Sequence, residues 1–316
     1  MNPPRRKRPS TLLPMPVSWT IERARALLGT KFVLIAGLVG FVVLAWLIEL
    51  VAGLEDPIAL SPLLALVVAA VPVVLWLAFF YVHDRLEPEP KHYVAGVSLL
   101  GALIAAPLSD FLIAQASPPL ALAQHGQALD LDRIVYLVGV VGLTQELCKY
   151  AVVRYTVYTS AEFDEPMDGV VYMMSVGAGF ALWENYHRLT GQGLRVYLST
   201  GAADAVVTTL AHASFAGALG YVLGRARFTR RSAATRGILV MVGLLGAALL
   251  NGQFAVGKAY LDEVLPRTPW AKVAFAATTA ALVFAALLLV SRRLVALSPF
   301  RPARPPGPDQ AAGGAP

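Results

Sequence analysis

The stretch GLTQELCKYAVVR, residues 142–154, places a glutamine, a glutamate and a lysine inside an apolar run that begins near Ile134 and continues to about Tyr158. Charged side chains are costly at the middle of a bilayer, so they are rare in membrane spans and face a protein interior or a water-filled cavity. The stretch therefore predicts a helix that crosses a membrane and carries part of an internal polar site.

The composition of the whole chain supports this interpretation. Of 316 residues, 57% are apolar and 15% are charged, whereas a soluble domain carries about 25% charged residues. The apolar residues gather in runs of about 20, which is the length that a helix needs to cross a bilayer. Because lipid offers no partner to an unpaired backbone group, these spans must be helices. The sequence predicts an all-α fold, a polytopic membrane helix bundle with about eight transmembrane helices. The runs are 32–53, 60–82, 93–116, 134–158, 168–188, 199–223, 237–257 and 270–291.

Basic residues cluster beside alternate spans. The clusters are Arg5, Arg6, Lys7, Arg8, Arg23, Arg25 and Lys31; Arg225, Arg227, Arg230, Arg231 and Arg236; and Arg292, Arg293, Arg301 and Arg304. The positive-inside rule places both the N- and C-termini in the cytoplasm, which fits eight crossings. We expect a multi-pass protein of the plasma membrane whose basic clusters contact anionic lipid, and no nucleic acid as a partner.

The domain organisation follows from these spans. Residues 1–30 form a basic cytoplasmic segment in which 17–30 has the pattern of an interfacial helix. Residues 31–292 form the membrane-embedded domain, and the Pro- and Gly-rich residues 293–316 form a disordered cytoplasmic tail. A single cysteine, Cys148, excludes a disulfide within the chain and a cysteine-based zinc site.

Polar residues concentrate in three consecutive spans, 134–158, 168–188 and 199–223. They are Gln145, Glu146, Lys149, Asp168, Glu184, Asn185, Asp204 and His212. This concentration favours one shared internal site over scattered defects.

Glu146 and Lys149 are three residues apart, so they can pair on one face of a helix. We interpret Lys149 as a structural partner that neutralises Glu146. Glu146 itself lies near the middle of its span beside Gln145, and these two side chains together can present oxygens to a cavity.

Glu184 lies late in its span, seven residues after Gly177 on the same helical face. Small residues such as Gly177 and Ala181 allow another helix to approach closely, and a buried carboxylate there can exchange protons near neutral pH. The alternative is that Glu184 lies near the outer interface and is simply solvated.

Asp204, Thr208 and His212 repeat every four residues and therefore share one face of a helix. A buried histidine with a hydroxyl one turn away can serve as a base, an electrophile or a ligand. The alternative is a histidine that only packs. Buried Glu, Asp and His also mark proton paths in transporters, although the absence of internal repeats counts against a proton-coupled transporter.

Four motifs in order resemble those of the PrsW-type intramembrane proteases, within the CAAX-protease and bacteriocin-processing superfamily. They are HDRLEPEPK (83–91), QELCK (145–149), DGVVY with FALWEN (168–185) and HASFAG (212–217). The resemblance covers about residues 75–257. It implies a peptidase that hydrolyses a peptide bond of a membrane-anchored substrate by water activated by Glu and His. In known relatives that substrate is an anti-sigma factor.

The resemblance implies a catalytic core of Glu146, Glu184 and His212. The expected supporting residues are Gln145, Lys149, Asn185, Asp204, Thr208 and Asn251. We expect no cofactor. Zinc is the alternative, and Glu146, Glu184 and His212 would then be its three ligands with none to spare.

Two positions depart from the family pattern. The first glutamate of the family's EExxK motif is Gln145 here, and the histidine often found one turn before Asn251 is Ala247. The loss of that glutamate leaves a second interpretation open, a non-catalytic membrane scaffold or receptor with the same fold.

Overall fold

The structure is a computed structural model that describes residues 17–83, 89–116, 129–191, 195–265 and 267–295. Within these ranges the chain is helical apart from short connections and one isolated β-bridge between Ile58 and Val196, which confirms the predicted all-α fold. The predictions for residues 1–16 and 296–316 lie outside the described residues. The elements are α1 (Val17–Val51), α2 (Pro62–His83), α3 (Lys91–Leu100), η1 (Gly101–Ala105), α4 (Ala106–Ala116), α6 (Leu131–Val135), η2 (Tyr136–Gly142), α7 (Leu143–Thr156), α8 (Asp168–Thr190), α9 (Leu198–Phe228), α10 (Ala233–Val264) and α11 (Pro269–Val295).

Seven helical stretches of the described chain are long and apolar enough to cross a membrane. They are Gly29–Val51, Pro62–Val82, Lys91–Ala116, Leu131–Thr156, Leu198–Phe228, Ala233–Val264 and Pro269–Leu294. The remaining predicted span, 168–188, corresponds to α8, which is not among these apolar stretches. Its 23 residues are still about 34 Å long at 1.5 Å per residue. Most of its side chains are buried by other helices, so α8 does not need the uniformly apolar surface of a lipid-facing span.

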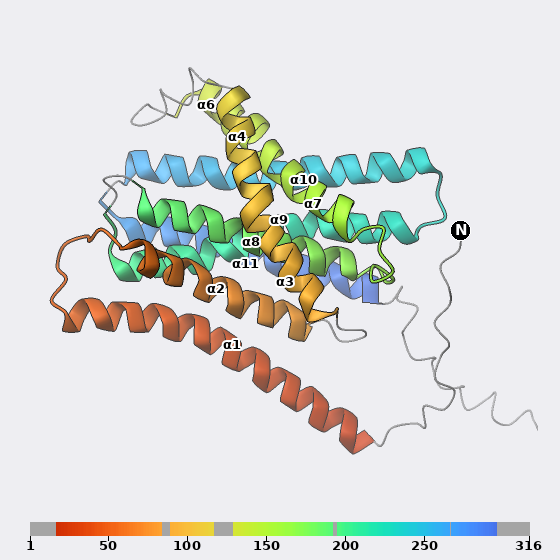
Figure 1. Cartoon of the computed structure of the whole chain (residues 1–316), viewed down its shortest axis with the longest axis horizontal. Helices are drawn as coiled ribbons and strands as arrows, with labels where there is room; N and C mark the ends of the chain where they lie inside the picture. The colour runs from red at the N-terminus through yellow and green to blue at the C-terminus, as the bar shows by residue number, and fades with distance from the viewer. Residues whose placement is uncertain (1–16, 84–88, 117–128, 192–194, 266, 296–316) are drawn as a thin grey trace, which may run out of the picture.

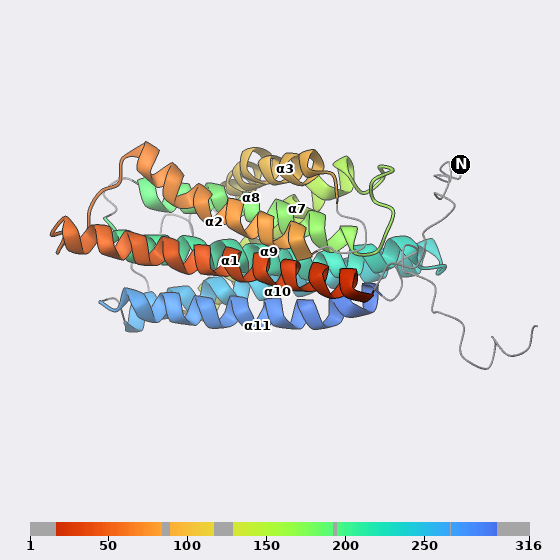
Figure 2. The same ribbon diagram turned by 90° about the horizontal axis from the view of Figure 1, so that it is seen from below.

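Helices α8 and α9 run antiparallel through the centre of the bundle (Figure 1). Helices α2 and α3 lie on the α8 side of this pair, and α10 and α11 lie on the α9 side (Figure 2), while α1 packs against α9 and α2. The start of α1 and the end of α11 lie at the same end of the bundle (Figure 1), as the predicted even number of crossings requires. Helix α1 is continuous from Val17 to Val51, so the segment 17–30 extends the first span.

Two spans contain π-helical segments. In the span Lys91–Ala116, η1 separates α3 from α4, and in the span Leu131–Thr156, η2 directly precedes α7. A π-helical turn inserts an extra residue into an α-helix and is frequent at functional sites. Segment η2 ends at Gly142, three residues before Gln145, and a Cβ at Gly142 would lie 2.5 Å from the Ala248 carbonyl oxygen of α10. This close approach brings α10 against the start of α7.

Glycines also set the spacing of α8 and its neighbours. A Cβ at Gly177 would lie 2.5 Å from the carbonyl oxygen of His212 on α9, and a Cβ at Gly179 would overlap the Ser98 carbonyl of α3. The predicted close approach at Gly177 is therefore present, and it occurs at the residue that carries the imidazole.

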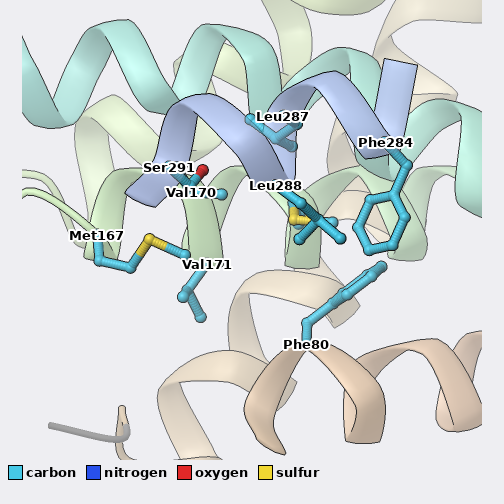
Figure 3. A pocket seen from close by; sticks show the side chains of 9 residues that line it. Phe80, Met167, Val170, Val171, Phe284, Leu287, Leu288 and Ser291 are labelled. Atoms are coloured by element: carbon cyan, nitrogen blue, oxygen red, sulfur yellow. The ribbon is translucent and has the colours of Figure 1, made fainter. Parts of the chain in front are cut away.

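A cavity between α2, α8 and α11 does not form a site. Phe80, Met167, Val171 and Phe284 are among its lining side chains (Figure 3). Its volume of about 10 Å³ is room for one water molecule at most, and its walls are almost entirely apolar. We interpret it as a packing gap.

The connection before α3 is fixed to α8 by a buried carboxyl group. Glu89 is buried and accepts a short hydrogen bond from the Tyr172 hydroxyl. Burial raises the pKa of Glu89 from 4.5 to about 7, although hydrogen bonds with Asp168 and Tyr172 act in the opposite direction. In the folded protein the group therefore remains protonated at pH values where it would ionise in an unfolded chain.

We expect Gly177→Ala to destabilise the protein by about 1–3 kcal/mol, because the added methyl group must push α9 away from α8. Gly96→Ala is the matched control, since a Cβ at Gly96 on α3 meets nothing within 4 Å. It should be neutral or stabilise by about 0.5–1 kcal/mol through higher helix propensity. Thermal unfolding of the purified protein in detergent measures both. Equal effects of the two variants would contradict the proposed tight crossing.

We expect the stabilising contribution of Glu89 to be lost as the pH rises. A pKa that is raised in the folded state means that the contribution is fully present below pH 4.5 and disappears as the pH passes about 7. The free energy of unfolding of the wild type, relative to Glu89→Gln, should therefore fall by roughly 1–3 kcal/mol between acid and mildly alkaline pH. A difference that stays constant across this range would show that Glu89 does not titrate abnormally.

Candidate functional site

Polar side chains from four helices form one connected network inside the bundle. Glu146 comes from α7, Glu184 from α8, His212 from α9 and Asn251 from α10. The structure therefore brings together the three residues predicted as the catalytic core, and the hydrogen bonds that join them can be followed atom by atom.

His212 is held at both ring nitrogens. Its Nε2 lies 2.7 Å from Glu184 Oε2, and its Nδ1 lies 2.9 Å from the ammonium nitrogen of Lys149. An ammonium group only donates hydrogen bonds, so Nδ1 must accept. The ring is therefore neutral with its proton on Nε2, and this N–H donates to Glu184. Lys149 thus fixes the tautomer of the histidine.

Lys149 has more partners than the sequence indicated. The predicted pair is present, because the Lys149 ammonium donates to Glu146 Oε1 at 2.7 Å and both side chains are fully buried. The same ammonium contacts His212 and lies 4.3 Å from the centre of the Phe180 ring, within the range of a cation–π contact. Lys149 therefore connects the acid on α7 to the imidazole on α9.

Glu146 has one oxygen in use and one that is open. Its Oε1 accepts from Lys149 and, at 2.9 Å, from Asn251 Nδ2, whereas its Oε2 has no hydrogen-bond partner among the described residues. A buried carboxylate oxygen without a partner is unusual in a folded protein. A water molecule or a substrate N–H would satisfy it.

Gln145 uses both ends of its amide within the network. Its nitrogen donates to Glu184 Oε1 at 2.8 Å, and its oxygen accepts from Asn251 Nδ2 at 2.9 Å. Asn251 in turn has both hydrogens of its nitrogen engaged, one with Gln145 and one with Glu146. The amide at position 145 therefore links the two glutamates without placing two carboxylates against each other.

Asn185 and Thr208, two of the predicted supporting residues, are not hydrogen-bonded to this network. Asn185 donates to the Ala205 carbonyl at 3.2 Å and to Thr209 Oγ1 at 3.4 Å, so it joins α8 to α9. Thr208 is fully buried, and its hydroxyl has no hydrogen-bond partner in the described part of the chain. Among the described residues, these two therefore make no hydrogen bond to the acids or to the imidazole.

Asp204 belongs to a cluster of charged residues whose other members, Arg188 and Lys258, were not predicted from the sequence. It accepts a short hydrogen bond from Arg188 and a second one from Lys258 at 2.8 Å. Arg188 Nη2 also lies 3.7 Å from Glu184 Oε2. The signal for Arg188 was its position four residues after Glu184, on the same helical face. Nothing local in the sequence indicated Lys258, which reaches Asp204 from α10.

Exposure identifies the accessible side of the network. The side chains of Glu146 and Lys149 are 0% exposed, whereas Glu184 is 20% and Arg188 is 39% exposed. Glu184 is thus both a member of the network and partly open to the surroundings. A water molecule or a substrate would reach the site from the side of Glu184 and Arg188.

The donor atoms do not fit one metal ion. Zinc needs three protein ligands around one point at about 2.0–2.2 Å. Glu184 contacts the Nε2 edge of His212, whereas Glu146 reaches the imidazole from the Nδ1 edge through the Lys149 ammonium. An ion bound to either nitrogen would have only one of the two glutamates beside it. Accordingly, the described residues contain no group of three His, Cys, Asp or Glu placed to hold a metal ion.

Comparisons with known proteins agree with the motifs. The profile described as PrsW family intramembrane metalloprotease matches residues 89–290. Protease PrsW of Geobacillus kaustophilus is 33% identical over 157 residues, which cover 50% of this chain and 64% of that protein. Protease PrsW of Bacillus subtilis is 28% identical over 183 residues, which cover 58% of this chain and 77% of that protein. No solved structure matches the chain significantly.

The match thus covers slightly less than two thirds of the length of the Geobacillus protein. The family profile, by contrast, extends over more than half of this chain. It includes all four helices that contribute to the polar network. The chain belongs to the PrsW family.

Proposed function

We propose that this protein is an intramembrane endopeptidase that cleaves a membrane-anchored protein with a water molecule activated by Glu184 and His212. One observation carries the proposal. The imidazole of His212 is hydrogen-bonded at one nitrogen to Glu184 and at the other to the Lys149–Glu146 pair, inside a bundle of membrane-spanning helices. Such a buried and ordered set of an acid, an imidazole and a cation suits hydrolysis better than it suits packing.

Glu184 is the general base in this mechanism. It is the glutamate of the network that is accessible from outside, and its carboxylate touches the imidazole. A water molecule beside Glu184 gives its proton to the carboxylate while its oxygen attacks the peptide carbonyl carbon. Glu184 later passes the proton to the leaving amine, so the peptide bond is replaced by one carboxyl and one amino end.

His212 stabilises the negative charge that forms on the carbonyl oxygen. Once Glu184 has taken the proton, it is a weaker acceptor, and the Nε2–H of His212 becomes free to donate to the oxyanion. Arg188, within 4 Å of the same carboxylate, adds a positive charge at this point. Donors that are already in place contribute strongly to such a reaction because they need no reorganisation.

Lys149 and Glu146 keep the imidazole ready for this step. Lys149 holds the proton of His212 on Nε2, and Glu146 balances the charge of the buried ammonium. A buried cation without its partner is strongly destabilising, so Glu146 is required even if it never touches the water. The family description contains the word metalloprotease, but the mechanism uses only residues of this chain because their donor atoms do not fit a metal ion.

The substrate is a protein with a membrane anchor. Its helix must unwind next to Glu184 so that the peptide bond becomes accessible. The exposed side of the network lies toward the end of α8, so the cleaved bond lies near the end of the substrate helix and not at its middle. An anti-sigma factor is the substrate class that the motif resemblance implies. The relatives' names state only that they are proteases.

A non-catalytic scaffold or receptor is the second candidate, and Gln145 favours it. The amide is fully hydrogen-bonded where the family motif has a carboxylate, so the network could be maintained for its stability alone. Substitution at position 145 distinguishes the two candidates.

We expect Glu184→Ala and His212→Ala each to lower cleavage of a reconstituted membrane-anchored substrate by about 10²–10⁴-fold, the usual contribution of a general acid or base. Glu146→Ala should also abolish cleavage, but with loss of thermal stability because Lys149 is left unpaired. His187→Ala is the control, since His187 lies one turn from Glu184 and packs on Trp183 outside the network. Full activity in any two of the three network variants would disprove the mechanism.

We expect Gln145→Glu to change the rate less than about tenfold at pH 7 and to move the optimum to lower pH. Two facing carboxylates cannot both ionise, so positions 145 and 184 would have to share a proton. The measurement is the pH profile of cleavage, with Gln145→Ala as the variant that removes the amide and adds no charge. A gain of 100-fold or more in the glutamate variant would instead identify the native chain as a pseudoenzyme.

A further inference from the structure

A second cavity, far from the polar network, opens where α9 ends and α10 begins. Its volume is about 640 Å³, within the range of ligand-binding pockets. It lies at the end of the bundle that also holds the start of α1 and the end of α11 (Figure 1), which the positive-inside rule predicts to be cytoplasmic. The lining residues are Pro166, Tyr221, Val222, Arg225, Phe228, Thr229, Arg230, Arg231 and Leu239.

The charge of this cavity is entirely positive. Three of its lining residues, Arg225, Arg230 and Arg231, are arginines, and none is a carboxylate. Within the described chain none of the three has an ion-pair partner, and Arg225 donates only to the Tyr221 hydroxyl. The nearby Arg227 differs, because it donates to the Ser160 carbonyl and packs on aromatic rings.

The start of α10 adds to the positive potential. Arg230 and Arg231 come just before Ser232, which caps this 32-residue helix by accepting a hydrogen bond from the Thr235 N–H, and the first turn contains no acidic residue. The N-terminus of a helix carries a partial positive charge and unpaired N–H groups that favour an anion. Three arginines therefore line one volume, close to the positive end of this helix.

The cavity also has an apolar wall. Val222 and Leu239 lie one to two turns inside α9 and α10 from the arginines, on the side toward the membrane-spanning part of both helices. A ligand with a phosphate group and a hydrocarbon chain matches both walls, because guanidinium groups bind phosphate oxygens well and the chain would cover the apolar residues.

The ends of the protein itself are poor occupants on grounds of charge. Residues 1–16 contain four basic residues and no acidic one, and residues 296–316 contain two arginines and one aspartate. The first segment is strongly positive and the second has no net negative charge, so neither offers the three arginines an anionic partner.

We propose that this cavity binds the headgroup phosphate of an anionic phospholipid. The phosphate lies against Arg225, Arg230 and Arg231, and an acyl chain lies along Val222 and Leu239. The bound lipid fastens the end of α9, which carries His212, to the start of α10, which carries Asn251. The site is independent of the proposed peptidase activity, since no group in it touches the polar network.

The test is lipid binding to the purified full chain in neutral detergent, measured by native mass spectrometry with phosphatidylglycerol and phosphatidylcholine. We expect phosphatidylglycerol to bind more tightly. Arg230→Gln with Arg231→Gln should weaken its binding about 25-fold, because each arginine near an anionic lipid contributes roughly a factor of five. The matched control is Arg292→Gln with Arg293→Gln. This is another adjacent, exposed pair at the same end of the bundle, and it should change binding less than about threefold.

Three results would overturn the proposal. One is equal weakening by the two double variants, which would mean general attraction to the basic surface. Another is equal binding of the two lipids by the wild type. The third is displacement of phosphatidylglycerol by millimolar inorganic phosphate, which would identify a site for free phosphate. All three are independent of any cleavage assay.

Discussion

A single buried positive charge determines how four helices of this protein meet. Lys149 is fully buried, so its ammonium must find partners within the protein. It finds them in Glu146 on its own helix and in His212 on α9, with the ring of Phe180 from α8 beside it. Each partner is held further: Glu146 accepts a second hydrogen bond from Asn251, and His212 donates to Glu184, which also accepts from Gln145. The cost of leaving any member unpaired in this environment fixes the register of α7, α8, α9 and α10.

Close helix packing makes this polar network possible. Hydrogen bonds of 2.7–2.9 Å between side chains on different helices require backbones that approach more closely than large residues permit. Gly177 at the α8–α9 crossing and Gly142 at the end of η2 leave room for the facing carbonyl groups. In lipid, small residues of this kind are the usual means by which helices associate, and here they also place catalytic candidates within reach of one another.

Most of the fold could be predicted from the sequence, because lipid imposes a length and a composition on every span. The shared site was also predictable, since Glu146, Glu184 and His212 are costly in hydrocarbon unless they meet. The hydrogen bonds between side chains of different helices could not be predicted. The contact of Lys149 with His212, for example, depends on how each helix is rotated about its axis and how deep it lies, and composition does not encode either. Lys258 was missed for the same reason, and α8 lacks the expected apolar pattern because other helices, not lipid, surround it.

The amide of Gln145 changes the chemistry that the site can perform. A glutamate at this position would face Glu184, and two carboxylates in contact must hold a proton between them. With glutamine, the nitrogen donates to Glu184 Oε1, His212 donates to Oε2, and the positive charge of Arg188 lies nearby. Glu184 is thus held as a carboxylate that shares no proton with a second acid. In the mechanism that we propose, the role of base therefore belongs to Glu184, the glutamate of the network that is partly exposed.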